Sequence, residues 1–180
     1  MRVITGKARG IVLKTPDGMA TRPTTDRVKE ALFSIIQFEI PTARVLDLFG
    51  GTGQLGIEAL SREAKSAVFV DEREDACCLI RENLRRTKLE SQAKVIRSDY
   101  MAYLKTCRDK FDIILLDPPY AEVFLENSLK MITEIDILQS GGIIVAERPA
   151  DKELPWEFPG YSRSRDYKYG KTLITIYRKL

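Results

Sequence analysis

Short, almost continuously apolar runs alternate along the middle of the chain with segments whose apolar residues recur at helical spacing. The runs Val45-Leu46, Ala67-Val-Phe-Val70 and Ile113-Ile-Leu-Leu116 contain no polar residue. Strands of a parallel sheet have this composition, because helices bury both of its faces. The pattern therefore predicts an α/β domain with a mostly parallel sheet between two layers of helices.

The same periodicities give the bounds of the expected elements in this region. The expected strands are Arg44–Leu48, Ala67–Val70, Lys94–Arg97, Phe111–Leu116 and Gly142–Glu147. The expected helices are Gln54–Ser61, Asp75–Arg86, a short one around Tyr100–Leu104, and Phe124–Ile132. Each of the first four strands is followed by a helix, which is the order that produces parallel pairing.

The first 40 residues depart from this alternation. Arg2–Thr5 and Arg9–Lys14 are two β-like runs around a glycine, and they predict a hairpin. The segment Arg22–Asp26 reads as a loop that ends in helix-capping residues, and Val28–Phe38 has helical spacing. We expect residues 1–40 to form a hairpin and a helix packed against residues 41–180, within a single structural domain.

The last 20 residues also change character. Ser162–Lys168 and Thr172–Tyr177 are β-like runs that flank Tyr169-Gly170. Two such runs around a glycine turn predict an antiparallel hairpin at the edge of the sheet.

Composition narrows the class of protein. The chain has 180 residues, 44% of them hydrophobic, which suits one domain with a substantial core. No apolar run has the length of a membrane helix and no secretory signal is visible, so a cytoplasmic location is expected. Histidine is absent and the three cysteines lack metal-ligand spacing. We therefore expect neither disulfides nor a metal site, and no mechanism that needs an imidazole base.

The net charge of +3 is unevenly distributed. Residues 1–29 and 161–180 each carry +5, whereas residues 30–160 carry −7. Two basic ends around an acidic middle favour contact with a polyanion. The alternative is that these are ordinary solvated surface charges.

A glycine-rich segment, Asp47-Leu-Phe-Gly-Gly-Thr-Gly-Gln-Leu-Gly56, follows the first core strand and opens a helix. Gly51, Gly53 and Gly56 have the spacing that lets a backbone turn sharply and approach a ligand at a helix N-terminus. Asp71, 20 residues after Gly51, is placed to bind ribose hydroxyls. Taken alone, this fits a nicotinamide dinucleotide as well as any other adenosine cofactor.

Two further carboxylates favour S-adenosylmethionine. Asp47 precedes the glycines, where it would repel a pyrophosphate but attract the cationic amino-acid end of S-adenosylmethionine. Asp99 follows the third strand and can accept a hydrogen bond from the adenine amino group. Asp47, Asp71, Asp99 and Asp117 end four strands, so we expect them to line one crevice.

The most specific feature is Asp117-Pro118-Pro119-Tyr120, at the end of the apolar run Phe111–Leu116. The Asp117 carboxylate and the Pro118 carbonyl can both accept from an exocyclic base amine, and neither proline has an N–H. Tyr120 can stack on the base. The group therefore predicts methylation of a planar amine, with Asp117 accepting the proton that the amine releases.

These motifs, in this order, resemble the class I S-adenosylmethionine-dependent amino methyltransferases. Further segments are similar to the bacterial 16S rRNA (guanine-N2)-methyltransferase family: Met1–Gly6, Arg22–Val28, Phe49–Gly53, Gly56–Arg62, Arg81–Asn83 and Tyr169-Gly170. The resemblance covers nearly the whole chain. It implies a Rossmann-like, mostly parallel seven-stranded sheet with an antiparallel edge hairpin, in which residues 41–180 bind the cofactor.

The same resemblance implies methylation of the N2 amine of a guanine in 16S rRNA, within 30S subunits or assembly intermediates, with S-adenosylmethionine and no metal. A monomer is expected, with no membrane contact.

Site residues are expected in three groups. The catalytic group is Asp117, Pro118, Pro119 and Tyr120. The cofactor group is Asp47, Phe49, Gly51, Gly53, Asp71, Glu72, Asp99 and Tyr100. The RNA-contacting group is Arg2, Lys7, Arg9, Arg22, Thr24 and Arg27. Glu58 and Glu147 are expected to orient loops.

Three other functions fit parts of the pattern. An adenine-N6 methyltransferase acting on DNA or RNA shares the Asp-Pro-Pro-Tyr group. An NAD-dependent oxidoreductase shares the glycine spacing, although Asp47 and the missing histidine argue against it. A non-catalytic RNA-binding assembly factor would share the basic ends but would leave Asp117–Tyr120 without a purpose.

Overall fold

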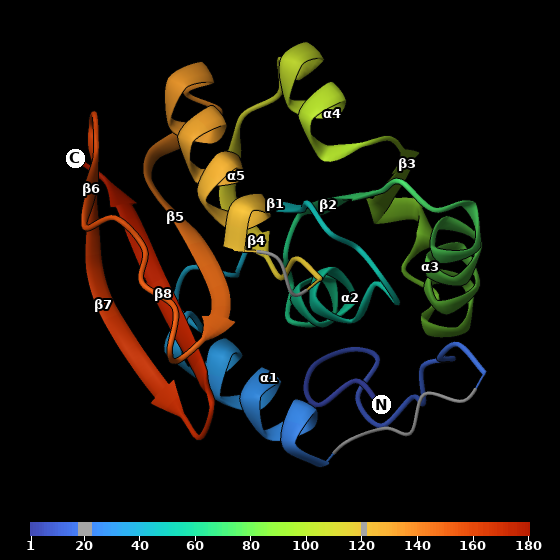
Figure 1. The fold of residues 1–180 in the computed structure, drawn as a ribbon. Helices are drawn as coiled ribbons and strands as arrows, with labels where there is room; N and C mark the ends of the chain where they lie inside the picture. Colours follow the sequence, from blue (N-terminus) through green and yellow to red (C-terminus); the bar gives the residue numbers. More distant parts are fainter. Residues whose placement is uncertain (18–22, 120–121) are drawn as a thin grey trace.

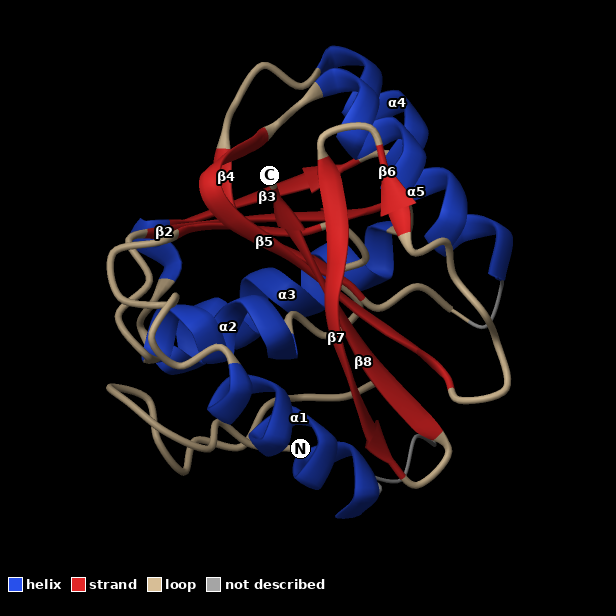
Figure 2. Cartoon of the chain, turned by 90° about the vertical axis from the view of Figure 1, so that its left-hand side faces the viewer, coloured by secondary structure: helices blue, strands red, loops and turns tan. Residues whose placement is uncertain are grey.

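The computed structural model describes residues 1–17, 23–119 and 122–180. At its centre is an eight-stranded sheet in the order β3-β2-β1-β4-β5-β8-β7-β6, flanked by helices (Figures 1 and 2). The strands are β1 (Arg44–Asp47), β2 (Ser66–Asp71), β3 (Ala93–Arg97), β4 (Phe111–Leu116), β5 (Leu138–Pro149), β6 (Glu157–Phe158), β7 (Tyr161–Tyr169) and β8 (Thr172–Lys179). The helices are α1 (Pro23–Ile35), α2 (Gln54–Ser61), α3 (Glu74–Thr87), α4 (Tyr100–Thr106) and α5 (Glu122–Ile135), with a 3₁₀ turn at Glu90–Gln92.

The pairing is parallel from β3 to β5 and antiparallel beyond it. The expected α/β class with an antiparallel edge hairpin is confirmed. The sheet has one strand more than the seven expected. The additional strand β6 arises because the chain reverses at Gly160, at φ 77°, and pairs Phe158 with Tyr161 at the start of β7.

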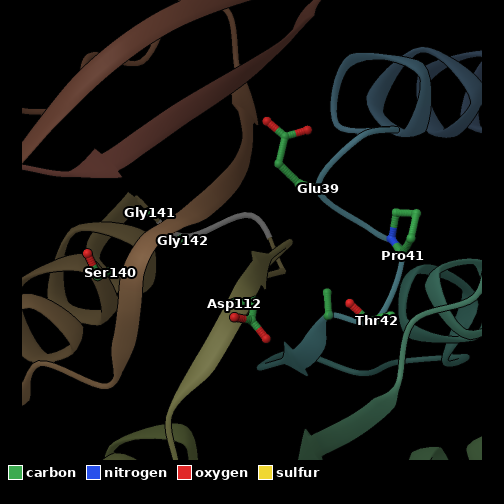
Figure 3. Close-up of a pocket in the computed structure, with 8 residues that line it drawn as sticks. Glu39, Pro41, Thr42, Asp112, Ser140, Gly141 and Gly142 are labelled. Atoms are coloured by element: carbon green, nitrogen blue, oxygen red, sulfur yellow. The ribbon is translucent and has the colours of Figure 1, made fainter.

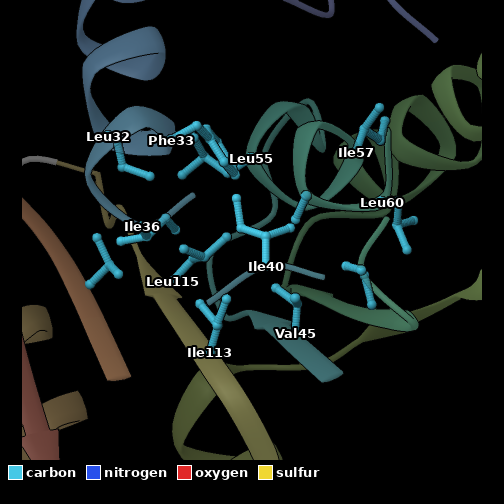
Figure 4. Packing of buried hydrophobic residues seen from close by; sticks show 14 of the residues in the cluster. Leu32, Phe33, Ile36, Ile40, Val45, Leu55, Ile57, Leu60, Ile113 and Leu115 are labelled. Atoms are coloured by element: carbon cyan, nitrogen blue, oxygen red, sulfur yellow. The ribbon is translucent and has the colours of Figure 1, made fainter. Parts of the chain in front are cut away.

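Helices cover the two faces of the parallel strands in separate layers. The apolar side chains of α1, α2 and α3 pack on one face together with Val45 and Leu115 (Figure 4). Those of α4 and α5 pack on the other face with Leu46 and Leu116. Successive strand residues thus alternate between the two cores, as the pleat requires. Among the helices of the described ranges, none combines the length and the apolar character needed to cross a bilayer.

The N-terminal segment, defined as residues 1–14, forms a shortened version of the predicted hairpin. One antiparallel bridge joins Arg2 to Val12, and backbone N–H groups of Val3 and Gly10 donate to the carbonyls of Ile11 (3.0 Å) and Val3 (2.8 Å). The residues between the two arms pack closely against α2, since a Cβ atom on Gly6 would lie 1.8 Å from the Ser61 carbonyl oxygen. The pairing therefore stays too short to count as two strands.

Helix α1 is also displaced from its expected bounds. It begins at Pro23, so most of the segment predicted as a loop is helical. Proline suits the first turn of a helix, because its φ is already close to helical and its missing N–H would have no partner there. The helix ends at Ile35 and not at Phe38, whose side chain is 88% exposed and contributes no core packing.

Buried polar groups hold the N-terminal segment in place. The Glu58 carboxylate accepts from the N–H groups of Ile4 (2.8 Å) and Thr5 (3.0 Å) and from Nε of Arg62 (2.8 Å). Nζ of Lys29, also buried, lies 3.8 Å from the same carboxylate. Glu58 therefore orients this segment, in agreement with its expected role in ordering a loop.

Candidate active site

The carboxyl ends of the parallel strands β1, β2, β4 and β5 lie at one side of the sheet, and each carries an acidic residue: β1 and β2 end in one, another directly follows β4, and the fourth lies two residues before the end of β5. These strand-tip carboxylates are Asp47, Asp71, Asp117 and Glu147. The strand order reverses between β1 and β4, and ligands of α/β sheets bind outside the carboxyl ends of the strands at such a reversal. The order of the strands therefore brings three of the expected acidic residues, Asp47, Asp71 and Asp117, to the place where the strand order reverses.

All four strand-tip carboxylates belong to the same face of the sheet. Val45, Ala67, Leu115 and Val145 pack in the core beneath α1, α2 and α3, and each acidic residue follows the nearest of them at an interval of two or four positions. Because side chains alternate along a strand, the carboxylates point to that same side. They therefore lie next to the glycine-rich segment that opens α2.

Hydrogen bonds from the glycine-rich segment fix two of these carboxylates. Asp71 Oδ2 accepts from the N–H of Gly51 at 2.9 Å, and Asp47 Oδ2 accepts from the N–H of Gly56 at 3.0 Å. Gly51 and Gly53 have φ values of 56° and 80°, which L side chains rarely adopt. The glycines are thus required for the backbone path that joins β1 to α2.

The N-terminal segment supports this glycine loop from behind through α3. The buried Asn83 accepts from the N–H of Lys14 at 2.7 Å and donates to the carbonyls of Lys14 (3.0 Å) and Thr52 (2.9 Å). Thr52 Oγ1 also donates to the sulfur of Met1 at 3.3 Å. One amide side chain therefore joins the basic N-terminus to the loop expected to hold the cofactor.

The donor set around the glycine loop fits an adenosine cofactor. Oε1 of Gln54, the first residue of α2, is buried, has no hydrogen-bond partner among the described residues and can accept from an amine. Gly51 is exposed, and a Cβ there would meet only its neighbour's carbonyl at 4.0 Å, so space is open beside it. Each Asp71 oxygen has one protein donor and retains a lone pair for a ribose hydroxyl.

Three aromatic rings cluster at the same edge of the sheet. The ring of Phe49 lies 5.3 Å from that of Tyr100 and 6.4 Å from that of Phe124, and the last two are 5.5 Å apart. Phe49 and Tyr100 were expected near the cofactor, whereas Phe124 was missed. Its signal is an aromatic residue in the first turn of the helix that follows Asp117–Tyr120.

Asp99 and Glu72 have different positions from the buried acidic residues. Asp99 is exposed and caps α4, where its Oδ1 accepts from the N–H of Ala102 at 3.0 Å. Its second oxygen is available to a ligand. Glu72 is exposed at the turn after β2.

Burial raises the pKa of three strand-tip carboxyls. The pKa of Asp47 rises to about 7, because burial and the charges of Asp117 and Asp71 outweigh the hydrogen bond from Gly56. Burial raises the pKa of Asp117 to about 6, and burial together with the Asp117 charge raises that of Glu147 to about 8. Perturbed carboxyls that share one edge of a sheet mark a candidate functional site.

The two remaining groups of expected residues are only partly described. Pro118 is half-buried and Pro119 is exposed, next to Asp117, while Tyr120 lies outside the described residues. The side chains of Arg2, Lys7, Arg9 and Arg27 are exposed. Arg22 lies outside the described residues, and Thr24 lies in the first turn of α1.

The expected role of Glu147 in orienting a loop stays a prediction. Within the part of the chain that the structure describes, its carboxyl accepts no hydrogen bond from an N–H or hydroxyl group and makes no ion pair. The sequence did carry a signal, because Glu147 follows the apolar run Ile143–Ala146 just as Asp117 follows Phe111–Leu116.

A separate cavity of about 200 Å³ lies at the opposite edge of the sheet, where β1 and β4 begin (Figure 3). Its lining includes Glu39, Asp112 and Ser140 (Figure 3). Asp112 accepts from the N–H of Arg44 at 2.8 Å, and Glu39 pairs with Arg178 at 2.7 Å. These acidic groups are engaged in holding the fold, and the cavity is remote from the strand tips.

Comparisons with known proteins show the family to which the chain belongs. The family model described as conserved hypothetical protein 95 matches residues 1–178. The Bacillus subtilis (strain 168) protein named "Putative rRNA methyltransferase YlbH" is 41% identical over 182 residues, which cover 99% of each chain. The "Ribosomal RNA small subunit methyltransferase D" of Escherichia coli (strain K12) is 32% identical over 179 residues, covering 99% of this chain and 90% of that protein.

A solved structure supports the same relationship. The Escherichia coli structure titled "Putative methyltransferase yhhF" superposes with a TM-score of 0.90 at 30% identity, over 99% of this chain and 97% of that one. The fold is that of a class I methyltransferase.

Proposed function

The chain belongs to the family described as conserved hypothetical protein 95, and we propose that it transfers a methyl group from S-adenosylmethionine to the N2 amine of a guanine in 16S rRNA. The names of the relatives support ribosomal RNA of the small subunit as the substrate class. The observation that carries the chemistry is the group of acidic strand tips at the reversal of strand order, beside a glycine loop suited to an adenosine cofactor.

In this proposal the cofactor supplies an already activated methyl group, and the protein supplies position and a proton acceptor. Asp71 holds the ribose, Gln54 and the glycine loop hold the amino-acid end, and Phe49, Tyr100 and Phe124 pack near the adenine. Asp117 and the Pro118 carbonyl accept from the base amine and direct its lone pair. As nitrogen forms its bond to carbon it becomes cationic, and Asp117 takes the released proton.

The exposed basic side chains of the N-terminal segment would contact RNA phosphates beside this site. Arg2, Lys7 and Arg9 have the exposure that this requires, and Arg22, Thr24 and Arg27 follow along the chain. The target base must leave its stack to reach Asp117, which is easiest in a loop or an assembly intermediate. We propose 30S particles or their precursors as the physiological partner of a monomeric enzyme.

The test is methyl transfer with isotopically labelled S-adenosylmethionine to four substrates: 30S particles, precursor particles, naked 16S rRNA and duplex DNA. Label in small-subunit RNA, mapped by mass spectrometry to N2-methylguanine, is the expected result. Label in N6-methyladenine would replace the proposal with adenine methylation. Stabilisation by NAD but not by S-adenosylmethionine in a thermal-shift comparison would refute it.

A further inference from the structure

Asp117 and Glu147 form a pair of carboxyls whose juxtaposition follows from the sheet. Strands β4 and β5 are parallel neighbours, and Leu116 pairs with Ala146. Asp117 and Glu147 are the next residues on the two strands, and both belong to the face that holds Leu115 and Val145. Neighbouring strands lie about 4.8 Å apart, so the two carboxyls are close to each other.

No cation compensates this pair within the described residues. Several buried charges elsewhere in the described residues are paired, as Arg148 is with Asp166 at 3.0 Å and Glu58 is with Arg62 at 2.8 Å. Asp117 and Glu147 take part in no ion pair and accept no hydrogen bond from an N–H or hydroxyl group in the part of the chain that the structure describes. Two adjacent carboxylates without a counter-charge do not readily ionise together.

We infer that Asp117 and Glu147 share one proton, and that Glu147 is a positioning residue which donates a hydrogen bond to the Asp117 carboxylate. The inference rests on the proposed function for its catalytic meaning, but not for the shared proton itself. With one proton, the pair offers one acceptor to the base amine and one O–H that orients this acceptor. With two protons, no acceptor would remain.

The direction of the titrations agrees with the geometry. Burial and the charge of Asp117 raise the pKa of Glu147 to about 8, while the pKa of Asp117 rises to about 6. Near pH 7 the pair therefore holds a single proton, mostly on Glu147. Among the described residues, Asp117 is the charge that raises the pKa of Glu147. On β8, the residue opposite Glu147 is the apolar Ile174. Asp47, on β1, lies on the other side of β4, where its own pKa is raised in part by the charge of Asp117.

The proton balance of methyl transfer is consistent with this arrangement. The nitrogen lone pair forms the N–CH₃ bond, the C–S bond breaks, and its electron pair remains on sulfur. The amine nitrogen then releases one proton to the Asp117 carboxylate. Glu147 keeps its own proton throughout, so the pair passes from one negative charge to none.

The direct test is a carbon-13 NMR titration of the side-chain carboxyls in the full chain, without RNA or cofactor. We expect two separated steps, one below and one above neutral pH. Asp117→Asn should lower the midpoint of Glu147, and Glu147→Gln should abolish the upper step. An unchanged Glu147 midpoint in Asp117→Asn, or ionisation of both groups below pH 5, would overturn the inference. Asp112→Asn, at the opposite end of β4, is the matched control and should leave both steps in place.

Kinetics separate a hydrogen-bonding role from a packing role. Glu147→Gln is a permanent neutral donor and should keep kcat near that of the wild type at neutral pH, without an alkaline limb in its pH profile. Glu147→Leu cannot donate and should lower kcat about tenfold, as expected for one lost hydrogen bond. Equal rates for the two variants would contradict the donor role. Failure of all variants and the wild type to methylate RNA would instead refute the proposed function, and the titrations would still stand.

Discussion

Two regions, one around the buried Glu58 and one around the buried Asp47 with the half-buried Asp117 and Glu147, surround carboxylates in opposite ways. Glu58 lies between α2 and the N-terminal segment, where two backbone N–H groups, Arg62 and Lys29 surround it. At the strand tips, Asp47 has one backbone donor, and Asp117 and Glu147 have neither donor nor cation among the described residues. In the first region the carboxylate is saturated with donors and connects two parts of the fold. In the second region the carboxylate oxygens still have free acceptor positions.

The difference teaches that burial of a charge does not by itself identify a functional residue. A buried carboxylate surrounded by donors stabilises the fold, and removal of one partner is costly. A buried carboxylate without donors destabilises the fold, and its retention calls for a functional reason. At the strand tips, burial raises the pKa values of Asp47, Asp117 and Glu147.

The largest expected effect is on stability, at Glu58. Glu58→Gln should lower the free energy of unfolding by about 3–5 kcal/mol, because it leaves Lys29 buried without its counter-charge. Chemical denaturation followed by circular dichroism measures this loss. The double variant Glu58→Gln/Lys29→Met should recover part of this loss. A loss below about 0.5 kcal/mol in the single variant would show that Glu58 does not stabilise the fold, and would contradict the contrast between the two regions.

Asp117 should show the reverse behaviour. Asp117→Ala should reduce methyl transfer by at least about 100-fold, the usual contribution of a positioned proton acceptor, and should not reduce the free energy of unfolding. S-adenosylmethionine binding, measured by calorimetry, should persist. The control is Asp112→Ala, which should keep full activity and lose about 1 kcal/mol of stability with the bond to Arg44. Activity of Asp117→Ala at the wild-type level would exclude the assigned role.

The pH dependence of stability sharpens the comparison further. Asp47 has a folded-state pKa of about 7 against an ordinary value of 3.8, so the folded state binds its proton more tightly. Its contribution to stability should be present at low pH and should be lost as the pH rises through about 7. Thermal unfolding of the wild type and Asp47→Asn between about pH 5 and 8 measures this difference. A wild-type curve that rises more steeply with pH than the variant's would contradict the assigned shift.

The smallest effects are expected at the exposed cations of the N-terminal segment. Lys7→Ala and Arg9→Ala should each change stability by less than about 0.5 kcal/mol, in contrast to the buried Lys29. Each substitution should also make the plot of the logarithm of the RNA-binding constant against the logarithm of the salt concentration less steep. The magnitude of the slope should fall by about 0.7–0.9 for each side chain that contacts one RNA phosphate. Fluorescence anisotropy with a 16S rRNA fragment measures the slope. Unchanged slopes would show that these side chains do not contact RNA phosphates.

The sequence by itself determined the fold class, the parallel order of the central strands and the positions of the acidic strand tips. Hydrophobic periodicity is a local property of the chain, so the runs before Asp47 and Asp117 could be recognised without a structure. The glycine spacing likewise predicted a loop at the start of α2, because positive φ at Gly51 and Gly53 is a local requirement.

Only the tertiary structure decided which polar groups are satisfied and by which partners. The role of Glu58 depends on contacts with Ile4 and Lys29, which are distant from it in sequence. The proximity of Glu147 to Asp117 depends on the register of β4 against β5. The N-terminal hairpin is short for the same reason, since its two arms bond to each other only from residues 1 to 3 against residues 10 to 13, and its backbone also bonds to α2 and α3. Desolvation and pairing are properties of the packed chain, and the linear order of residues does not contain them.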